Sequence, residues 1–469
     1  MAKVDMCLSA GSALQRVQSD QGKWGVLMLQ YGWTVALFLA AIAIAGPGAD
    51  AKETVTDVAP AWAGHPVGFA LLTHGDWQFV AFYDAKRKLT VGSRKLSETS
   101  WHFVKLPETV GWDSHNYITM AVDDDGCIHL CANMHVNPLV YFRTSKPDDI
   151  DTFERVPSMV GRNEDKCTYP SFFRGPNKEF IFTYRYGSSG NGDQYYNVYD
   201  CKTRAWKPLM DGPLTSGEGQ MNAYFGGLRL GPDGYYHLAW IWRDTGDCTT
   251  NHDISYARSR DLVHWETSGG KPLKLPMTLK TCEIVDPVPV KAGAINTSVA
   301  LSFDSHRRPV ISYIKYDEKG LTQAYVARVE DGKWKIRQVS EWDYRWAFSG
   351  YGSIQGEVHV GGVSPVDDGK LALPYTHIKY GGGKLILDEA TLKLIEDSRT
   401  ASAAITGDVK PAQEAKPKLE SRTCGDSGSS TEPGVRYMLR WETYGIHRDK
   451  AWEGEPPPPC MLKLVKVEP

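Results

Sequence analysis

The feature that most constrains this chain is a strand–turn–strand unit that recurs six times between residues 67 and 378. In every unit, two runs of alternating apolar and polar residues flank a turn that contains Gly or Asp. Period-two alternation around such a turn is the signature of a β-hairpin. The units lie at residues 67–84, 118–135, 169–186, 223–244, 298–317 and 358–378.

The spacing of these units predicts the fold. Their starts lie roughly 50–75 residues apart, and repeats of about this length that supply four strands each are typical of β-propeller blades. Six clear units and a terminal one predict an all-β, seven-bladed β-propeller that forms a single domain. We expect the last strand, at 460–467, to pair with residues near 55–62, because ring closure removes the exposed edges of an open sheet.

The first 51 residues differ from the repeats. Residues 24–45 form a stretch hydrophobic enough to enter a membrane, and small residues follow it at Ala49 and Ala51. This pattern predicts a secretory signal peptide that is removed after about Ala51. The alternative is an uncleaved membrane anchor, because the stretch approaches spanning length. We therefore expect a secreted or periplasmic protein, or a membrane-tethered one if the segment is retained.

A second segment, residues 399–434, interrupts the repeats. It is rich in Ala, Lys, Pro, Ser and Glu and has few large apolar side chains. Such a composition predicts a mobile surface insertion. The insertion would separate the blades at 52–398 from the closing strands at 435–469.

Composition excludes several classes of function. A formal net charge of −3 argues against a nucleic-acid-binding protein, which needs a broad basic surface. Nine cysteines without a CxxC pair argue against a disulfide framework but leave one or two bridges open. The sequence holds no GxSxG, GxGxxG, Walker A or HExxH motif, so we expect no nucleotide or other organic cofactor.

Two histidines of the second unit are candidate catalytic residues. In a propeller, functional side chains gather at the central mouth, on loops and strand ends. His115 precedes the first strand of the unit and His135 ends its second strand, so we expect both at one end of the hairpin. Two imidazoles there suit acid–base catalysis near neutral pH. The alternative is that both are structural, which is also our interpretation of His129 in mid-strand.

The third unit repeats this geometry with other residues. Tyr169 opens its first strand, and Arg185 ends its second, just before a Gly- and Ser-rich stretch at 187–192. An Arg in this position would bind a carboxylate through two parallel hydrogen bonds. Tyr224 opens the fourth unit in the equivalent place. The alternatives are that Arg185 pairs with a neighbouring Asp and that Tyr224 only packs.

A second group of residues has metal-binding chemistry. His237 and His252 lie on adjoining predicted strands, and Cys282 and His377 follow later in the chain. Three imidazoles and a thiolate would make a tetrahedral Zn²⁺ site. The alternative is four unrelated polar residues, because nothing in their spacing requires them to meet.

Several long segments of the chain resemble the BNR-repeat-containing propeller proteins, a group that includes the seven-bladed ulvan lyases. The segments are HNYITMAVDDDGCIHLCANMHVNPLVYFRT, TYPSFF, YRYGSSGNG, NHDISYARSRDLVHWET and RWETYGIHRD. The resemblance covers most of residues 60–450 apart from the predicted insertion, and it is more specific for the fold than for an activity.

The resemblance implies a role for each candidate residue. His115 and Tyr169 would act as base and acid, in an order left open, while Arg185 and His135 would neutralise a uronate carboxylate. Tyr224 and Asn116 would contact substrate. The structural zinc of the family would fall on His237, His252, Cys282 and His377, with Cys248 as an alternative to Cys282.

The resemblance implies an exported polysaccharide lyase that cleaves sulfated glycans of the ulvan kind, built from rhamnose and uronate, by β-elimination. The partner would be an anionic polysaccharide, with no nucleic acid, and the protein is expected to be a monomer. One alternative is a glycoside hydrolase on the same propeller, for example one that releases rhamnose from glucuronate. Another is a non-catalytic glycan-binding propeller, because a fold alone does not fix a function.

Overall fold

The computed structural model describes residues 52–367, 369–399, 418–428, 430 and 432–469. The predicted signal segment and residues 400–417 of the predicted insertion lie outside this range. The described residues form seven antiparallel sheets. They are numbered 1 to 7 in chain order, and the sheet that contains both β1 and β32 comes last. No helix in the described part of the chain is long and apolar enough to cross a membrane.

The first three sheets contain strands β2 to β15. Sheet 1 consists of β2 (Ala70–His74), β3 (Trp77–Tyr83), β4 (Lys88–Lys95) and β5 (His102–Thr109). Sheet 2 consists of β6 (Thr119–Val122), β7 (Ile128–Cys131), β9 (Tyr141–Thr144) and β10 (Phe153–Arg155). Sheet 3 consists of β8 (His135–Asn137), β11 (Cys167–Arg174), β12 (Phe180–Ser188), β13 (Asn191–Asp200), β14 (Ala205–Pro208) and β15 (Thr215–Ser216).

The next three sheets contain strands β16 to β29. Sheet 4 consists of β16 (Asn222–Leu230), β17 (Tyr236–Arg243), β18 (Asn251–Ser259), β19 (Trp265–Glu266) and β20 (Glu283–Asp286). Sheet 5 consists of β21 (Ala300–Phe303), β22 (Pro309–Tyr316), β23 (Thr322–Glu330) and β24 (Lys333–Gln338). Sheet 6 consists of β25 (Val358–Val360), β26 (Ser364–Pro365), β27 (Lys370–His377), β28 (Gly381–Asp388) and β29 (Leu394–Arg399).

Sheet 7 joins the two ends of the described chain. It consists of β30 (Leu419–Gly425), β31 (Arg436–Tyr444), β32 (Cys460–Glu468) and β1 (Lys52–Ala61). β1 pairs with β32 from Lys52 opposite Glu468 to Ala61 opposite Cys460, which confirms the predicted closing pair. Short 3₁₀ turns lie at η1 (Ile150–Thr152), η2 (Cys248–Thr250) and η3 (Asn296–Ser298).

The burial of each strand follows its place in its sheet. Strand β17 is buried along its whole length, and β3 is buried except for its first residue. Both are central strands covered on two faces by neighbouring sheets, so their runs are almost continuously apolar. By contrast, the outer strands β24 and β29 are mostly exposed and carry charged residues, which protects a sheet edge from pairing with another chain.

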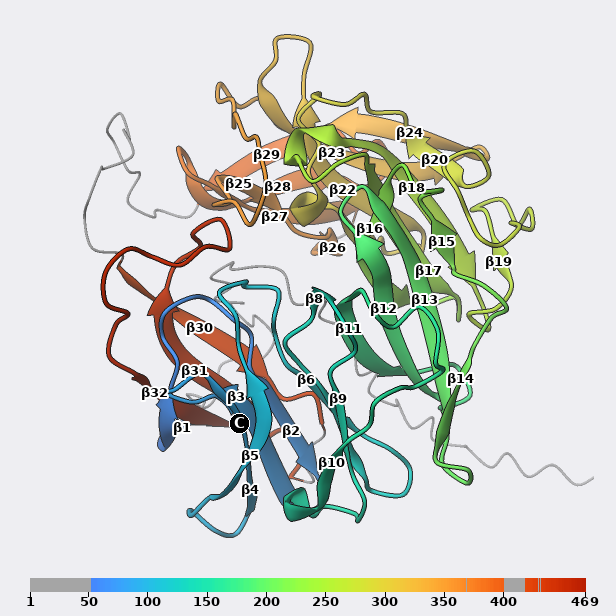
Figure 1. Ribbon diagram of the computed structural model, residues 1–469. Helices are drawn as coiled ribbons and strands as arrows, with labels where there is room; N and C mark the ends of the chain where they lie inside the picture. The colour runs from blue at the N-terminus through green and yellow to red at the C-terminus, as the bar shows by residue number, and fades with distance from the viewer. Residues whose placement is uncertain (1–51, 368, 400–417, 429, 431) are drawn as a thin grey trace, which may run out of the picture.

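The sheets form a propeller-like ring, in which β6, β8, β11, β16 and β30 border the centre (Figure 1). Successive sheets contact through β2 and β6, β6 and β11, β13 and β16, β16 and β21, and β22 and β25, and β30 contacts β2. Sheets 6 and 7 are linked by loops: Arg448 Nη1 donates to the carbonyl oxygen of Ser349 at 2.9 Å. The six hairpins predicted from the sequence are all present.

The predicted limits of the insertion, 399–434, are wrong. Residues Leu419–Gly425 form β30, which pairs with β31 on the inner side of sheet 7. A strand that borders the centre has little apolar surface to bury, so its polar composition resembles that of a loop. The cysteines of the described residues are all free, so the one or two disulfides left open by the sequence are not formed there.

Candidate active site

Two histidines, His115 from the loop before β6 and His135 from β8, stack on each other and share one carboxylate. The rings of His115 and His135 lie 4.0 Å apart between centroids, with 15° between their planes. Nδ1 of His115 contacts Oδ1 of Asp113, and Nδ1 of His135 contacts Oδ2 of the same side chain. Asp113 therefore holds both rings in one orientation.

His135 reaches this position by a route that the sequence did not reveal. We expected it to end the second strand of its hairpin, but β7 ends at Cys131 and His135 begins β8, opposite Thr168 of sheet 3. Asn133 and Val136 have φ values of 56° and 60°, a left-handed conformation that interrupts a strand. The predicted end of β7 is therefore wrong, although His115 and His135 still meet.

The charge on Asp113 determines how the histidines are protonated. Burial alone would raise the pKa of Asp113, but hydrogen bonds from His115 and His135 outweigh this effect and hold it well below its usual range. Because an ionised carboxylate can only accept, each imidazole donates from Nδ1. Burial, aided by the neighbouring His135, lowers the pKa of His115 to about 4 although Asp113 opposes it. At neutral pH His115 is therefore uncharged, with its lone pair on Nε2.

A second carboxylate, Asp449, approaches the same histidine from sheet 7. Asp449 Oδ2 lies 3.6 Å from Nδ1 of His115 and accepts the backbone N–H of Ser353 at 2.6 Å. Asp449 Oδ1 accepts the hydroxyls of Ser114 at 2.6 Å and Ser353 at 2.9 Å. Sequence reasoning missed both Asp113 and Asp449. Asp113 stands two residues before His115, and Asp449 ends the segment RWETYGIHRD. Both therefore lie in or next to segments that carry the family resemblance, but the sequence assigned neither of them a role.

Tyr169 faces the two histidines from β11. Its ring centroid lies 5.8 Å from that of His115 and 6.3 Å from that of His135. Its φ of 57° coincides with an irregularity in the pairing of β11 with β12 between Thr168 and Ser171. Such a conformation is costly for a bulky residue and is typical of functional positions. Burial, followed by the nearby Tyr224, raises the pKa of Tyr169 well above its usual range, so it stays protonated.

Arg185 is a buried cation without a carboxylate partner among the described residues. It is 1% exposed, and its Cζ lies 4.8 Å from the ring centroid of Tyr169. Nη1 donates to the Tyr224 hydroxyl at 3.4 Å, but Nε and Nη2 have no hydrogen-bond partner within the described part of the chain. Because a desolvated, unpaired guanidinium is expensive, this arrangement suits a site that receives an anion.

A second arginine, Arg243, which the sequence analysis missed, also lies over the ring of Tyr224. The Cζ of Arg243 is 5.5 Å from the ring centroid of Tyr224, whose hydroxyl is 2.6 Å from Oγ of Ser189. Burial would raise the pKa of Tyr224, but the charges of Arg185 and Arg243 outweigh it and lower the pKa. Strands β12, β16 and β17 thus hold two positive charges around one phenol.

Asn116, the other predicted substrate contact, is buried beside His115. Its backbone carbonyl accepts the hydroxyl of Tyr83 at 2.7 Å, and its side-chain Oδ1 has no hydrogen-bond partner in the described residues. The structure thus brings together His115, His135, Tyr169, Arg185 and Tyr224, whereas Asn116 adjoins them only through its neighbour His115 in the chain.

The four predicted zinc ligands do not meet. On β17, His237 is opposite Arg258, and Trp242 is opposite His252 of β18. Because Trp242 is five residues after His237, the two histidines lie about 16 Å apart along the hairpin. His237 lies between Asp233 Oδ1 at 2.9 Å and the Tyr256 hydroxyl at 2.6 Å.

The other predicted ligands also have separate surroundings. His252 contacts Asp244 and Asp253, at 2.9 and 2.8 Å. Cys282 Sγ is 3.4 Å from Ser255 Oγ, and the His377 ring packs 4.6 Å from that of Tyr380. Cys248, the alternative ligand, packs in the hydrophobic core of sheets 5 and 6. The predicted metal site is therefore wrong, because ligands from different blades have no local reason to converge.

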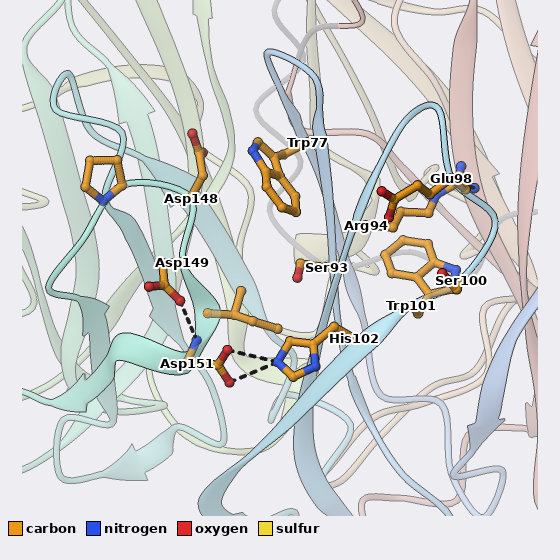
Figure 2. Close-up of a pocket in the computed structure, with 12 residues that line it drawn as sticks. Trp77, Ser93, Arg94, Glu98, Ser100, Trp101, His102, Asp148, Asp149 and Asp151 are labelled. Carbon is orange, nitrogen blue, oxygen red and sulfur yellow. Dashed lines mark hydrogen bonds and ion pairs between the residues drawn. The ribbon is translucent and has the colours of Figure 1, made fainter.

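A separate hollow of about 650 Å³ lies between sheets 1 and 2 (Figure 2). It shares no residue with the cluster described above. Four carboxylates line it, whereas Arg94 is the one arginine or lysine among its lining residues, so it would repel an anionic glycan. The lining residues are Trp77, Ser93, Arg94, Glu98, Ser100, Trp101, His102, Pro147, Asp148, Asp149, Ile150 and Asp151.

Comparison with known proteins yields a family and a fold. The model of the BNR repeat-containing family matches residues 77–342. The comparison with curated proteins found no match. The crystal structure of the polysaccharide lyase Uly1 is similar at a TM-score of 0.56 and 13% identity, over 89% of this chain and 98% of that one. A PL25 ulvan lyase bound to -[GlcA(1-4)Rha3S]- is similar at a TM-score of 0.52 and 14% identity, over 84% and 97% of the two chains.

Proposed function

We propose a function from one premise: this chain belongs to the BNR repeat-containing family, whose model matches more than half of it. The function is that of a polysaccharide lyase, which cleaves uronate-containing glycans by β-elimination. Two of the similar structures are of polysaccharide lyases, and one of them is bound to -[GlcA(1-4)Rha3S]-. Because a fold hosts many activities, the proposal depends on the chemistry of the site.

The observation that carries the proposal is the buried, unpaired guanidinium of Arg185. A uronate carboxylate would accept two parallel hydrogen bonds from Nε and Nη2, which have no other partner among the described residues. Elimination begins with the loss of H5, whose acidity is far too low for an unaided base. Neutralising the adjacent carboxylate stabilises the enolate-like intermediate that forms when this proton leaves.

His115 and Tyr169 have the protonation states that the two proton transfers need. The uncharged His115 takes H5 on Nε2, and the imidazolium that results is stabilised by Asp113. The C5–H electron pair forms the C4=C5 double bond, and the C4–O4 bond breaks. Tyr169, which stays protonated, donates its proton to the departing O4. Proton exchange with water then restores both side chains.

We assign a sulfated rhamnose–uronate glycan because two arginines surround Tyr224, which favours a strongly anionic substrate. The seven sheets would be the seven blades of a closed propeller, supported by the pairing of β1 with β32. Export through the N-terminal segment is supported by the hydrophobic stretch at 24–45.

The test is incubation with a panel of uronate glycans that includes ulvan. A lyase produces an ultraviolet-absorbing unsaturated uronyl end, and Arg185→Met should slow the appearance of this signal about 10²–10³-fold. His264→Ala is the matched control, because His264 is 87% exposed and lies outside the site. Release of free rhamnose without a double bond would indicate a hydrolase, and binding without turnover would indicate a lectin-like propeller. Either result overturns the proposal.

A further inference from the structure

Tyr351 is an unusually exposed aromatic residue. Its exposed fraction is 69%, the highest of any large hydrophobic side chain among the described residues. Single exposed apolar residues are common on protein surfaces, so exposure alone implies nothing. What sets Tyr351 apart is that its backbone is held in place and that its ring contacts residues linked to the candidate active site.

The segment that carries Tyr351, residues 349–353, is held from three sides. The backbone N–H of Gly350 donates to Asp247 Oδ1 at 2.9 Å, and Arg448 Nη1 donates to the carbonyl oxygen of Tyr351 at 3.1 Å. Ser353 Oγ lies 2.9 Å from Oγ of Ser114. The segment therefore bridges the loops of sheets 4, 7 and 2 and holds the tyrosine in place.

Two glycines allow this close approach. Gly350 and Gly352 have φ values of 84° and 75°, which favour glycine. A Cβ on Gly352 would lie 2.5 Å from the carbonyl oxygen of Arg448. The backbone on both sides of Tyr351 is thus fitted to its neighbours, while the ring is left in solvent.

A series of contacts links the Tyr351 ring to the candidate active site. The ring packs on Gly246, where an added Cβ would lie 2.6 Å from Cδ1 and Cε1 of the tyrosine. The carbonyl oxygen of Gly246 accepts a hydrogen bond from Arg243, which lies over Tyr224. Tyr224 in turn contacts Arg185. The exposed ring is therefore connected through Gly246 and Arg243 to the residues around Arg185.

We propose that Tyr351 forms an aromatic subsite, on which a pyranose ring next to the bound uronate stacks through its apolar C–H face. A glycan chain that places its carboxylate on Arg185 and continues past Arg243 and Gly246 would meet the exposed ring of Tyr351. Aromatic rings supply large contact area at low entropic cost. This inference rests on the proposed function and extends it to the neighbouring sugar.

The test compares Tyr351→Ala and Tyr351→Phe with wild type on a long uronate glycan and on the shortest oligosaccharide that is cleaved. Tyr351→Ala should raise KM for the long glycan about tenfold and leave kcat within about twofold, because the lost contact is equal in ground and transition states. Tyr351→Phe, which keeps the ring, should retain wild-type KM. Leu230→Ala is the control, since Leu230 is 57% exposed at the far end of β16. An unchanged KM in Tyr351→Ala would overturn the inference.

A binding measurement separates this inference from the proposed function. If wild type cleaves no glycan, the lyase proposal fails, and titration calorimetry with ulvan oligosaccharides then tests Tyr351 directly. An affinity that falls about tenfold in Tyr351→Ala but not in Leu230→Ala supports the aromatic subsite. Equal affinity in the two variants, or no binding to wild type, overturns it.

Discussion

The centre of the ring and the interior of the blades use the same residue types in different ways. Within sheet 2, Nε2 of His129 lies 3.1 Å from Asp123 Oδ2 and Nδ1 lies 2.7 Å from the Tyr141 hydroxyl. Sheet 4 repeats the arrangement with His237, Asp233 and Tyr256. In both places an Asp at the hairpin turn, a His on the second strand and a Tyr on the third satisfy one another within one sheet.

At the centre, histidine, aspartate and tyrosine come from several sheets. One carboxylate, Asp113, serves both His115 and His135, and Arg185 is buried nearby without an acidic partner in the described chain. The centre of the ring and the interior of the blades therefore cannot be told apart by residue type alone. What distinguishes them is that the central residues share contacts across sheets, and that a buried positive charge there has no acidic partner among the described residues.

Replacing each histidine by a residue that cannot titrate should separate catalysis from stability. His115→Ala should lower kcat/KM by about 10³-fold or more, because general base catalysis is lost. His129→Leu should leave kcat/KM of the folded enzyme unchanged but lower the free energy of unfolding by about 1–3 kcal/mol, because Asp123 loses its buried partner. Steady-state kinetics and urea unfolding check the pair, and an active His115→Ala enzyme would contradict the comparison.

The buried arginines offer a second contrast. Arg185→Met should lower kcat/KM about 10²–10³-fold without lowering stability, because no buried carboxylate is left unpaired. Arg328, equally buried, lies 3.2 Å from Asp304 and 2.6 Å from Glu330. Arg328→Met should therefore lower the free energy of unfolding by about 3–5 kcal/mol. Thermal unfolding distinguishes the variants; a similar loss of stability in both would break the distinction.

The pH dependence should show His115 acting in its uncharged form. Burial lowers the pKa of both His115 and His129 to about 4, against about 6.5 when unfolded. The unfolded chain therefore binds more protons in this window, and stability from both residues, present above pH 6.5, is lost as the pH falls toward 4. The acid limb of kcat/KM should lie near pH 4 in wild type and in His129→Leu. A limb near 6.5 in enzyme that circular dichroism shows to be folded would contradict this assignment.

The smallest expected effect is at Tyr351. Gly246→Ala places a methyl group against the Tyr351 ring and should raise KM for long glycans about threefold by shifting the ring, with little change in kcat. Gly332→Ala has no neighbour to displace and serves as the matched control for adding a methyl group, although its φ of 72° strains the turn. Michaelis–Menten kinetics on long and short substrates check the effect. An equal change on both substrates would place the cause at the uronate site instead.

Much of the ring could be predicted because its hairpins are local. Alternation around a Gly or Asp turn fixes which strands pair, and these hairpins carry Tyr169, Arg185 and Tyr224, with His115 in the loop before β6. The predicted place of Arg185 at the end of its strand is wrong, because β12 continues to Ser188. Family resemblance, not spacing, supplied the expected roles of these residues.

The site residues that the sequence analysis missed depend on contacts between distant segments, which no local pattern encodes. Asp449 lies 335 positions after Ser114 and reaches it only when the ring closes. Arg243 had no feature that distinguished it from other strand-end arginines until Tyr224 lay beside it. The prediction of four zinc ligands was wrong for the same reason, because each of these residues forms hydrogen bonds or packs with separate neighbours.

The central claim is that the centre of the ring performs elimination, and mass balance of a single cleavage tests it most directly. A uronate oligosaccharide of defined length is cut once, and both products are measured by mass spectrometry. The account predicts that the two product masses add up to the mass of the substrate, with a C4=C5 double bond in the fragment that carries the new non-reducing end. Products that together exceed the substrate by the mass of a water molecule would contradict it, because water would then have cleaved the bond.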